Sequence, residues 1–230
     1  MKSLLLILLT CFSIAHLRAQ TTADDVINGI IRAQGGREKL LSIKTVKMTG
    51  FLEFSGLKIP LTVYAIDKTA QRTEFTFSGM TGYMIVTRDS GFNFNPFQGQ
   101  RSPEKMTAED IALAKNDLDQ QGILLDYKKK GYEVELLDNE DVDGVDAYQL
   151  KITISPKKTL YYFVDPSTYY VIRIKTVQES NGQQQRNAQD FYDFKTTKDG
   201  YLYPHSFDNI TFTNIEVNLP LEDKLFRSGK

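Results

Sequence analysis

Side chains that could carry out catalysis are few in this sequence. Cys11 and one of the two histidines fall in an apolar N-terminal stretch, which leaves His205 as the only imidazole beyond it. A zinc site or a serine–histidine–aspartate triad would have to depend on His205 alone. His205 follows Pro204 at the expected start of a strand, where a structural role is favoured over a catalytic one. The motifs of α/β-hydrolases, zinc proteases, P-loop proteins and dinucleotide-binding proteins are absent from the sequence.

An acidic run at residues 138–148 invites a calcium interpretation. When the run is aligned on Gly144 as the loop glycine, three ligand positions are filled. The twelfth position, where such a loop needs glutamate, is Leu150 on an expected strand. We therefore expect a solvated hairpin turn, no metal and no cofactor. A carboxylate pair for glycoside hydrolysis stays open, because its spacing is three-dimensional. The absence of tryptophan disfavours a sugar-stacking site.

Aromatic side chains gather instead in the segment GFNFNPF, residues 91–97. Phe92 and Phe94 alternate at strand spacing, Pro96 ends the strand, and Phe97 follows directly. A helical pattern begins soon after this segment. We interpret the arrangement as a helix that closes over an apolar cavity, with the rings at its rim.

Two kinds of element must position these groups. Residues 22–42 form an N-terminal helix that is interrupted at Gln34–Gly36 and begins with a capping box from Thr22 to Asp25. Beyond residue 43 the apolar period is two, which predicts strands. The predicted strands cover 44–54, 57–65, 72–78, 80–87, 91–95, 132–137, 147–155, 159–164, 171–178, 189–195 and 203–212. Short turns join them, so we expect one curled antiparallel sheet.

A single helix interrupts the strands at residues 107–118. Ile111, Leu113, Ala114 and Leu118 give it one apolar side. Its place between two loops at the rim of a curved sheet is that of a lid. The alternative is a helix that packs on the sheet and never moves.

The first 20 residues are typical of a signal peptide. Lys2 precedes an apolar run that is too short to span a bilayer, and the segment ends on small residues. A lipoprotein signal with Cys11 as the acylated residue is disfavoured, because Thr10 precedes it and the apolar run continues past it. Cleavage leaves one domain, residues 21–230, without cysteine and therefore without disulfides or thiolate metal sites. We expect a periplasmic protein.

Charge excludes one class of partner. The loss of Lys2 and Arg18 with the leader lowers the formal net charge from −1 to −3. Nucleic-acid binding asks for a concentrated basic face, so we expect no nucleic acid as a partner.

At residues 89–97 the sequence resembles a known family. LolA-type periplasmic lipoprotein carriers have a segment of the form D-G-x-x-x-W-x-Y-N-P-F between a hairpin and the lid helix. Asp89, Gly91, Phe92, Phe94 and the run 95–97 fill a similar pattern, with phenylalanine in place of tryptophan and tyrosine. The start (residues 24–50) and the end (residues 215–226) also resemble exported proteins of outer-membrane lipoprotein sorting.

The resemblance implies a mainly β fold of the α+β class. A curved antiparallel sheet of about eleven strands would form an unclosed barrel with an N-terminal helix and a lid helix. The cavity between them would hold acyl chains. By position, the cavity wall would draw on Leu52, Phe54, Leu61, Val63, Phe75, Phe77, Met84 and Val86. The rim and lid would draw on Phe92, Phe94, Phe97, Ile111, Leu113 and Leu118. Each of these residues also fits plain core.

One departure from the family concerns the lid. The carriers are expected to hold it through an arginine on an early strand, and residues 44–54 offer Lys47 but no arginine. That arginine latch is therefore not transferred to this chain.

Three functions stay open at this point. The first is a non-enzymatic protein that binds lipid or acylated lipoprotein, with an outer-membrane acceptor protein and peripheral membrane contact as further partners. The second is an envelope binding or sensor module with a filled core that recognises a protein. The third, and least favoured, is an envelope hydrolase.

Overall fold

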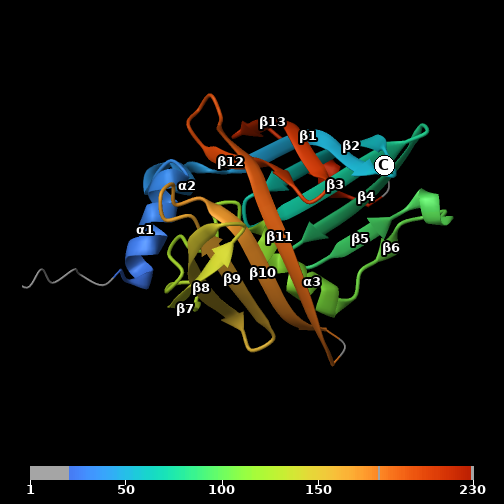
Figure 1. Ribbon diagram of the computed structural model, residues 1–230. Coiled ribbons are helices and arrows are strands. Elements are labelled where there is room, and N and C mark those ends of the chain that lie inside the picture. Colours follow the sequence, from blue (N-terminus) through green and yellow to red (C-terminus); the bar gives the residue numbers. More distant parts are fainter. Residues whose placement is uncertain (1–20, 181, 229–230) are drawn as a thin grey trace, which may run out of the picture.

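The computed structural model describes residues 21–180 and 182–228 (Figure 1). The predicted signal peptide lies outside the described residues. The chain begins with two helices, α1 (Ala23–Ala33) and α2 (Arg37–Ser42). The predicted capping box is present: the Asp25 N–H donates to the Thr22 hydroxyl over 3.2 Å, and the Thr22 N–H donates to the Asp25 carboxylate over 2.9 Å.

The described residues form a single antiparallel sheet of thirteen strands in the order β6-β5-β4-β3-β2-β1-β13-β12-β11-β10-β9-β8-β7. The strands are β1 (Thr45–Phe54), β2 (Leu57–Ile66), β3 (Ala70–Phe77), β4 (Met80–Thr87), β5 (Gly91–Phe94), β6 (Glu104–Lys105), β7 (Glu133–Val142), β8 (Val145–Ser155), β9 (Lys158–Val164), β10 (Val171–Ser180), β11 (Gln183–Thr196), β12 (Leu202–Phe207) and β13 (Ile210–Val217). In the described part of the chain β6 and β7 are not paired with each other, so the sheet curves without closing into a barrel.

The predicted fold class is confirmed, and two details of the strand prediction are corrected. The expected strand 203–212 is two strands, β12 and β13, because the chain turns at Asp208, whose φ is 47°. The two-residue strand β6 gave no alternation that could be read from the sequence. The acidic run spans the end of β7, the hairpin turn and the start of β8, and the Gly144 N–H in the turn donates to the Asp141 carboxylate.

Register defines two faces of the sheet. Val46, Met48 and Leu52 of β1 lie opposite Ala65, Val63 and Ile59 of β2, so these side chains share one face. We call it the inner face, because α1, α2 and the buried residues 123–125 pack on it. Val26 and Ile30 of α1 join Leu150 and Ile152 in one apolar cluster, and Leu40 joins Val46 and Leu61 in a second.

The outer face is covered at one place by the end of the chain. The short helix η3 (Asp223–Phe226) packs Phe226 against Tyr83 and Ile85. Arg72 is buried beneath it, where it donates to the Leu225 carbonyl and pairs with Glu74. Apolar packing and a paired arginine thus fix this segment on the outer face.

The predicted helix 107–118 is α3 (Ala108–Ala114) followed by a 3₁₀ turn, η2 (Lys115–Leu118). The Thr107 hydroxyl accepts the Asp110 N–H over 3.1 Å and caps the start of α3. In Figure 1, α3 lies between the β10–β11 hairpin and strands β5 and β6. Across the described residues, the helices are all too short or too polar to cross a bilayer.

Candidate functional site

The inner face is open at one end of the sheet, where the β1–β2 and β3–β4 hairpins turn. A cavity of about 650 Å³ lies there, which we call the tip cavity. Its walls come from β1, β2, β3 and the segment that follows β5. The lining residues are Leu52, Phe54, Ser55, Leu57, Ile59, Phe75, Phe77, Ser78, Met80, Asn95, Pro96, Phe97 and Gln98.

The segment Asn95–Gln98 positions one wall of the tip cavity. The Asn95 side chain accepts the Phe97 N–H over 3.2 Å, and Pro96 begins the short helix η1 (Pro96–Gln98). This turn places the Phe97 ring with its centroid 5.7 Å from that of Phe75 and 6.1 Å from that of Phe77. Tilted and edge-to-face aromatic contacts of this kind stabilise the cavity wall.

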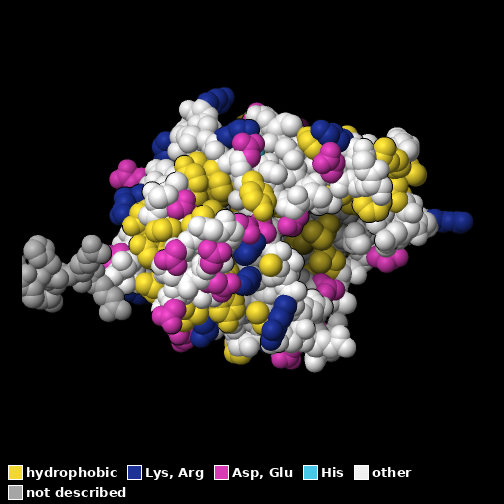
Figure 2. All heavy atoms as spheres, viewed as in Figure 1, with side chains coloured by type: hydrophobic (Ala, Val, Ile, Leu, Met, Phe, Trp, Pro, Cys, Tyr) yellow, Lys and Arg dark blue, Asp and Glu magenta, His cyan; other side chains and the backbone are white. Residues whose placement is uncertain are grey.

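Large apolar side chains at the tip cavity are unusually accessible. Phe54 is 63% exposed and Phe97 is 37% exposed, and Leu57, Phe77 and Met80 are exposed as well. Figure 2 shows hydrophobic side chains gathered at the right-hand end of the molecule and also inside a hollow right of centre. Contiguous exposed apolar surface is a mark of a binding site in a monomer.

The middle of the inner face is filled by the chain itself. Ile123 and Leu124 are buried against α1 and strands β8 and β9, and Leu125 is buried against α2 and β1. The chain's own side chains therefore occupy the inner face at this place. Residues 123–125 show no periodic apolar pattern, so the sequence did not predict that they belong to the core.

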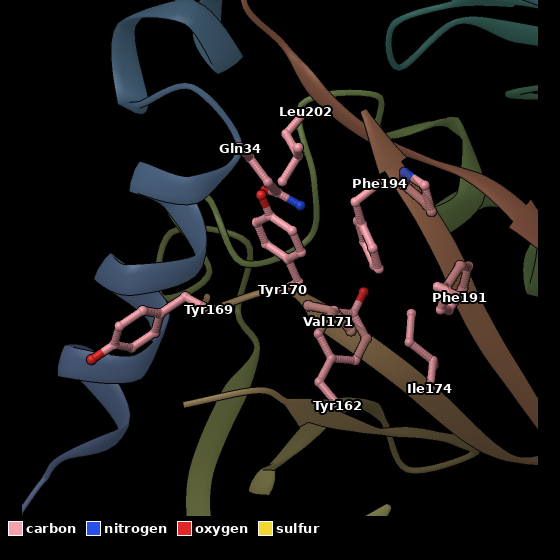
Figure 3. Close-up of a pocket in the computed structure, with 10 residues that line it drawn as sticks. Gln34, Tyr162, Tyr169, Tyr170, Val171, Ile174, Phe191, Phe194 and Leu202 are labelled. Carbon is pink, nitrogen blue, oxygen red and sulfur yellow. The ribbon is translucent and has the colours of Figure 1, made fainter. Parts of the chain in front are cut away.

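A second, smaller cavity lies beyond this filled region. It measures about 130 Å³ and is lined by Gln34, Tyr162, Tyr169, Tyr170, Val171, Ile174, Phe191, Phe194, Leu202 and Pro204 (Figure 3). The ring centroids of Tyr170 and Phe194 lie 4.7 Å apart with the rings tilted, while Tyr169 points away toward α1. Burial raises the pKa of the Tyr162 phenol far above its usual range, and the Asp117 and Asp119 carboxylates raise it further.

The predicted wall residues divide into two groups. Leu52, Phe54, Phe75 and Phe77 line the tip cavity. The others lie elsewhere on the same face: Leu61 is buried in the cluster with Val46, Val63 packs against that cluster, and Met84 and Val86 follow along β4. The sequence did not predict Leu57, Ile59 and Met80 as cavity residues. Leu57 lies opposite Phe54 and Met80 opposite Phe77 in two hairpins, so the signal was present.

The predicted rim is corrected. Phe92 lies opposite Ile85, and Phe94 lies opposite Tyr83 with ring centroids 5.5 Å apart, so both face the outer side of the sheet. Phe97 alone of the three lines the tip cavity. Pro96 and the turn that it begins carry Phe97 to the inner side.

The helix α3 covers the inner face away from the tip cavity. A Cβ added at Gly91 would lie 3.1 Å from Ile111, so α3 packs directly over β5. The buried Lys158 of β9 donates to the Leu113 carbonyl over 2.9 Å, and the Leu118 carbonyl accepts the Lys68 N–H. Among the described residues, α3 and η2 contribute nothing to the tip cavity lining.

His205 is the imidazole on which a catalytic site would have to depend. His205 is buried and its Nδ1 lies 2.9 Å from the Phe212 carbonyl oxygen, which is a structural contact. Within residues 21–180 and 182–228, His, Asp and Glu side chains do not gather in a group that could hold a metal ion.

Comparisons with known proteins identify the fold. No protein-family model and no curated protein matches the sequence. Solved structures do match over most of the chain. A LolA superfamily protein from Nitrosomonas europaea aligns over 90% of this chain and 98% of its own, with a TM-score of 0.56 and 14% identity.

Two further structures agree with the first. A domain named for outer membrane lipoprotein sorting, from Vibrio parahaemolyticus, covers 88% of this chain and 94% of its own, with a TM-score of 0.53 and 12% identity. A DUF1329 family protein from Desulfovibrio piger covers 89% and 96%, with a TM-score of 0.52 and 14% identity. The expected LolA-like fold is thereby confirmed. At sequence identities this low, the matches show the fold and do not indicate a ligand.

Proposed function

We propose that this chain, with its LolA-like fold, is an exported, non-enzymatic protein that binds the acyl chain of a lipid or lipoprotein in its tip cavity. The observation that carries the proposal is the tip cavity itself, which is wide, open and apolar. Its phenylalanine rings offer hydrocarbon an apolar surface, and acyl binding requires no catalytic group. The predicted signal peptide and the envelope proteins that share the fold support a location in the bacterial envelope.

The energetics of acyl binding are favourable at this site. Each CH₂ group that leaves water contributes about 0.8 kcal/mol. A chain that buries about eight CH₂ groups therefore gains about 6 kcal/mol before the loss of its conformational freedom. This range suits a protein that must accept and later release its cargo.

The test is the uptake of a fluorescent fatty acid by the purified protein. Phe97→Asp places a charge at the cavity mouth, on a side chain that is already partly exposed, so the fold should persist. Tyr192→Asp is the matched control, because Tyr192 is 51% exposed and lies on β11 outside the tip cavity. We expect Phe97→Asp to weaken uptake at least tenfold and Tyr192→Asp to leave it unchanged. Equal uptake by both variants would refute the assignment of the cavity.

A second candidate function is favoured by the filled middle of the inner face. Residues 123–125 occupy the place where a long cavity would run, as expected for a binding module with a packed core. Such a module would use the exposed rings around Phe54 and Phe97 to contact a protein. It predicts no fatty-acid uptake by the unaltered chain, whereas the lipid proposal requires it.

A further inference from the structure

Strands β12 and β13 are neighbours in the sheet but are paired over only two residues each. Ser206 lies opposite Thr211 and Phe207 opposite Ile210, and the pairing stops there. On their far sides both strands are paired over longer stretches, β12 with β11 and β13 with β1. The sheet is therefore split along part of the line between β12 and β13.

The split forms a slot of about 480 Å³. Its lining consists of the end of β11 and the turn after it (residues 195–199), His205, and β13 with its continuation (residues 213–220). We call this the β12–β13 slot. It shares no lining residue with the tip cavity.

Hydrogen bonds from α2 and from the start of β1 hold both walls of the slot in place. On one side, the Lys39 ammonium donates to the Asp199 carbonyl over 2.7 Å, and Ser42 bonds the Tyr201 hydroxyl at 2.9 Å. On the other side, the Lys44 N–H donates to the Asn218 side chain over 2.8 Å, and the Thr45 hydroxyl donates to the Leu219 carbonyl. The slot is thus built into the fold.

Inside the slot β13 offers unpaired main-chain groups. The Asn218 N–H donates to the Thr45 carbonyl, so Asn218, Glu216 and Asn214 direct their main-chain groups toward β1. By alternation, Ile215 and Val217 direct theirs into the slot. The described part of β12 supplies no strand partner for them.

Side chains of β12 are consistent with an edge that faces a gap. The His205 side chain takes the place of one main-chain hydrogen bond between β12 and β13, because its Nδ1 bonds the Phe212 carbonyl at 2.9 Å. Pro204 lacks an N–H, and proline is confined to strand positions where no ladder bond is needed. Beyond His205 the slot is open.

We propose that the β12–β13 slot binds an extended segment of a partner polypeptide by strand addition to β13. The free N–H and C=O groups of Ile215 and Val217 would pair with the main chain of the segment. Side chains opposite these two residues would share the inner face, so the segment should carry apolar residues two positions apart. The slot is lined by Lys195, Lys198, Asp199 and Glu216, whose charges balance, so recognition depends on the main chain.

The probe is a blocked hexapeptide with the sequence of residues 45–50, acetyl-Thr-Val-Lys-Met-Thr-Gly-amide. That sequence already pairs with β13 from the other side and has apolar residues at the required spacing. The control peptide carries N-methyl groups on its valine and methionine, which removes the donors that would face β13. Binding is followed by NMR of the purified protein, with amide hydrogen exchange as a second measurement.

In the free protein we expect the amides of Ile215 and Val217 to exchange faster than those of Asn214 and Glu216. The hexapeptide should shift and protect the Ile215 and Val217 amides, and N-methylation should weaken binding about tenfold or more. Equal binding of the N-methylated peptide would overturn the proposal. So would shifts at the free edge of β7, or the absence of binding up to about 1 mM peptide, the weak limit for strand addition.

Discussion

The ammonium of Lys158 lies 2.9 Å from the carbonyl oxygen of Leu113, and the lysine is only 7% exposed. Strand β9 thereby holds the last turn of α3. The same helix packs over Gly91 of β5, toward the other end of the sheet. The Asp117 carboxylate, 3.6 Å from the same ammonium, completes the contact. Strand β1 carries no arginine, and a lysine on β9 bonds the helix carbonyl here.

Replacement of this lysine should loosen the helix. Lys158→Met keeps the length of the side chain and removes a charged hydrogen bond to a helix C-terminus, which contributes about 1–3 kcal/mol. We expect faster hydrogen exchange across α3 and η2 and a lower free energy of unfolding. Lys157→Met is the matched control, since the neighbouring Lys157 is exposed and its ammonium lies 3.8 Å from the Glu179 carboxylate. Identical exchange in the two variants would show that Lys158 does not hold the helix.

Gly29 in α1 should tolerate no side chain. A Cβ at this position would lie 2.0 Å from the Tyr169 ring. Replacement of glycine by alanine in a helix normally stabilises by about 0.5–1 kcal/mol, but here the clash should destabilise by about 1–3 kcal/mol.

The adjacent position provides the control for Gly29. Asn28 is exposed on the same helix, so Asn28→Ala should leave stability unchanged or slightly raised. Thermal unfolding of both variants measures the difference. A Gly29→Ala protein as stable as the parent would mean that Tyr169 does not pack on α1.

Alkaline pH should destabilise the fold through buried tyrosines. Burial raises the pKa of the Tyr203 phenol, and Tyr201 raises it further. Burial also raises the pKa of the Tyr162 phenol. A phenol whose pKa is higher in the folded state stabilises the fold fully below its unfolded pKa of about 10 and loses this contribution as pH rises above it. We expect the free energy of unfolding to fall above about pH 10.

The Tyr203→Phe variant isolates this effect. The Tyr203 hydroxyl is buried without a hydrogen-bond partner in the described chain, so its removal should cost little at neutral pH. Denaturant unfolding between neutral and alkaline pH should show a shallower decline for the variant than for the parent. Parallel pH curves would mean that the Tyr203 hydroxyl is not buried in the folded state.

Local pattern predicted the elements well. The Thr22–Asp25 capping box marked the start of α1, and period-two alternation located the long strands. The fold class followed, because many short antiparallel strands around one amphipathic helix have few other arrangements. The sequence did not divide residues 203–212 into two strands, because neither glycine nor proline marks the turn at Asp208 and Asn209.

The site was less predictable from sequence. Alternation shows that Phe92 and Phe94 share a face but cannot say which face, because that depends on the cross-strand partners Ile85 and Tyr83. The aperiodic residues 123–125 gave no sign that they fill the middle of the sheet. The accessible rings at Phe54 and Phe97 arise where hairpin tips from distant parts of the sequence meet.

The central claim is that the tip cavity holds an acyl chain. Native mass spectrometry of the protein purified from its own envelope, followed by identification of the small molecules released on unfolding, tests it most directly. We predict a folded species that carries a fatty-acyl lipid, and loss of that lipid from the Phe97→Asp protein. A folded protein free of lipid, under conditions in which a lipid-binding control protein stays loaded, would contradict the account.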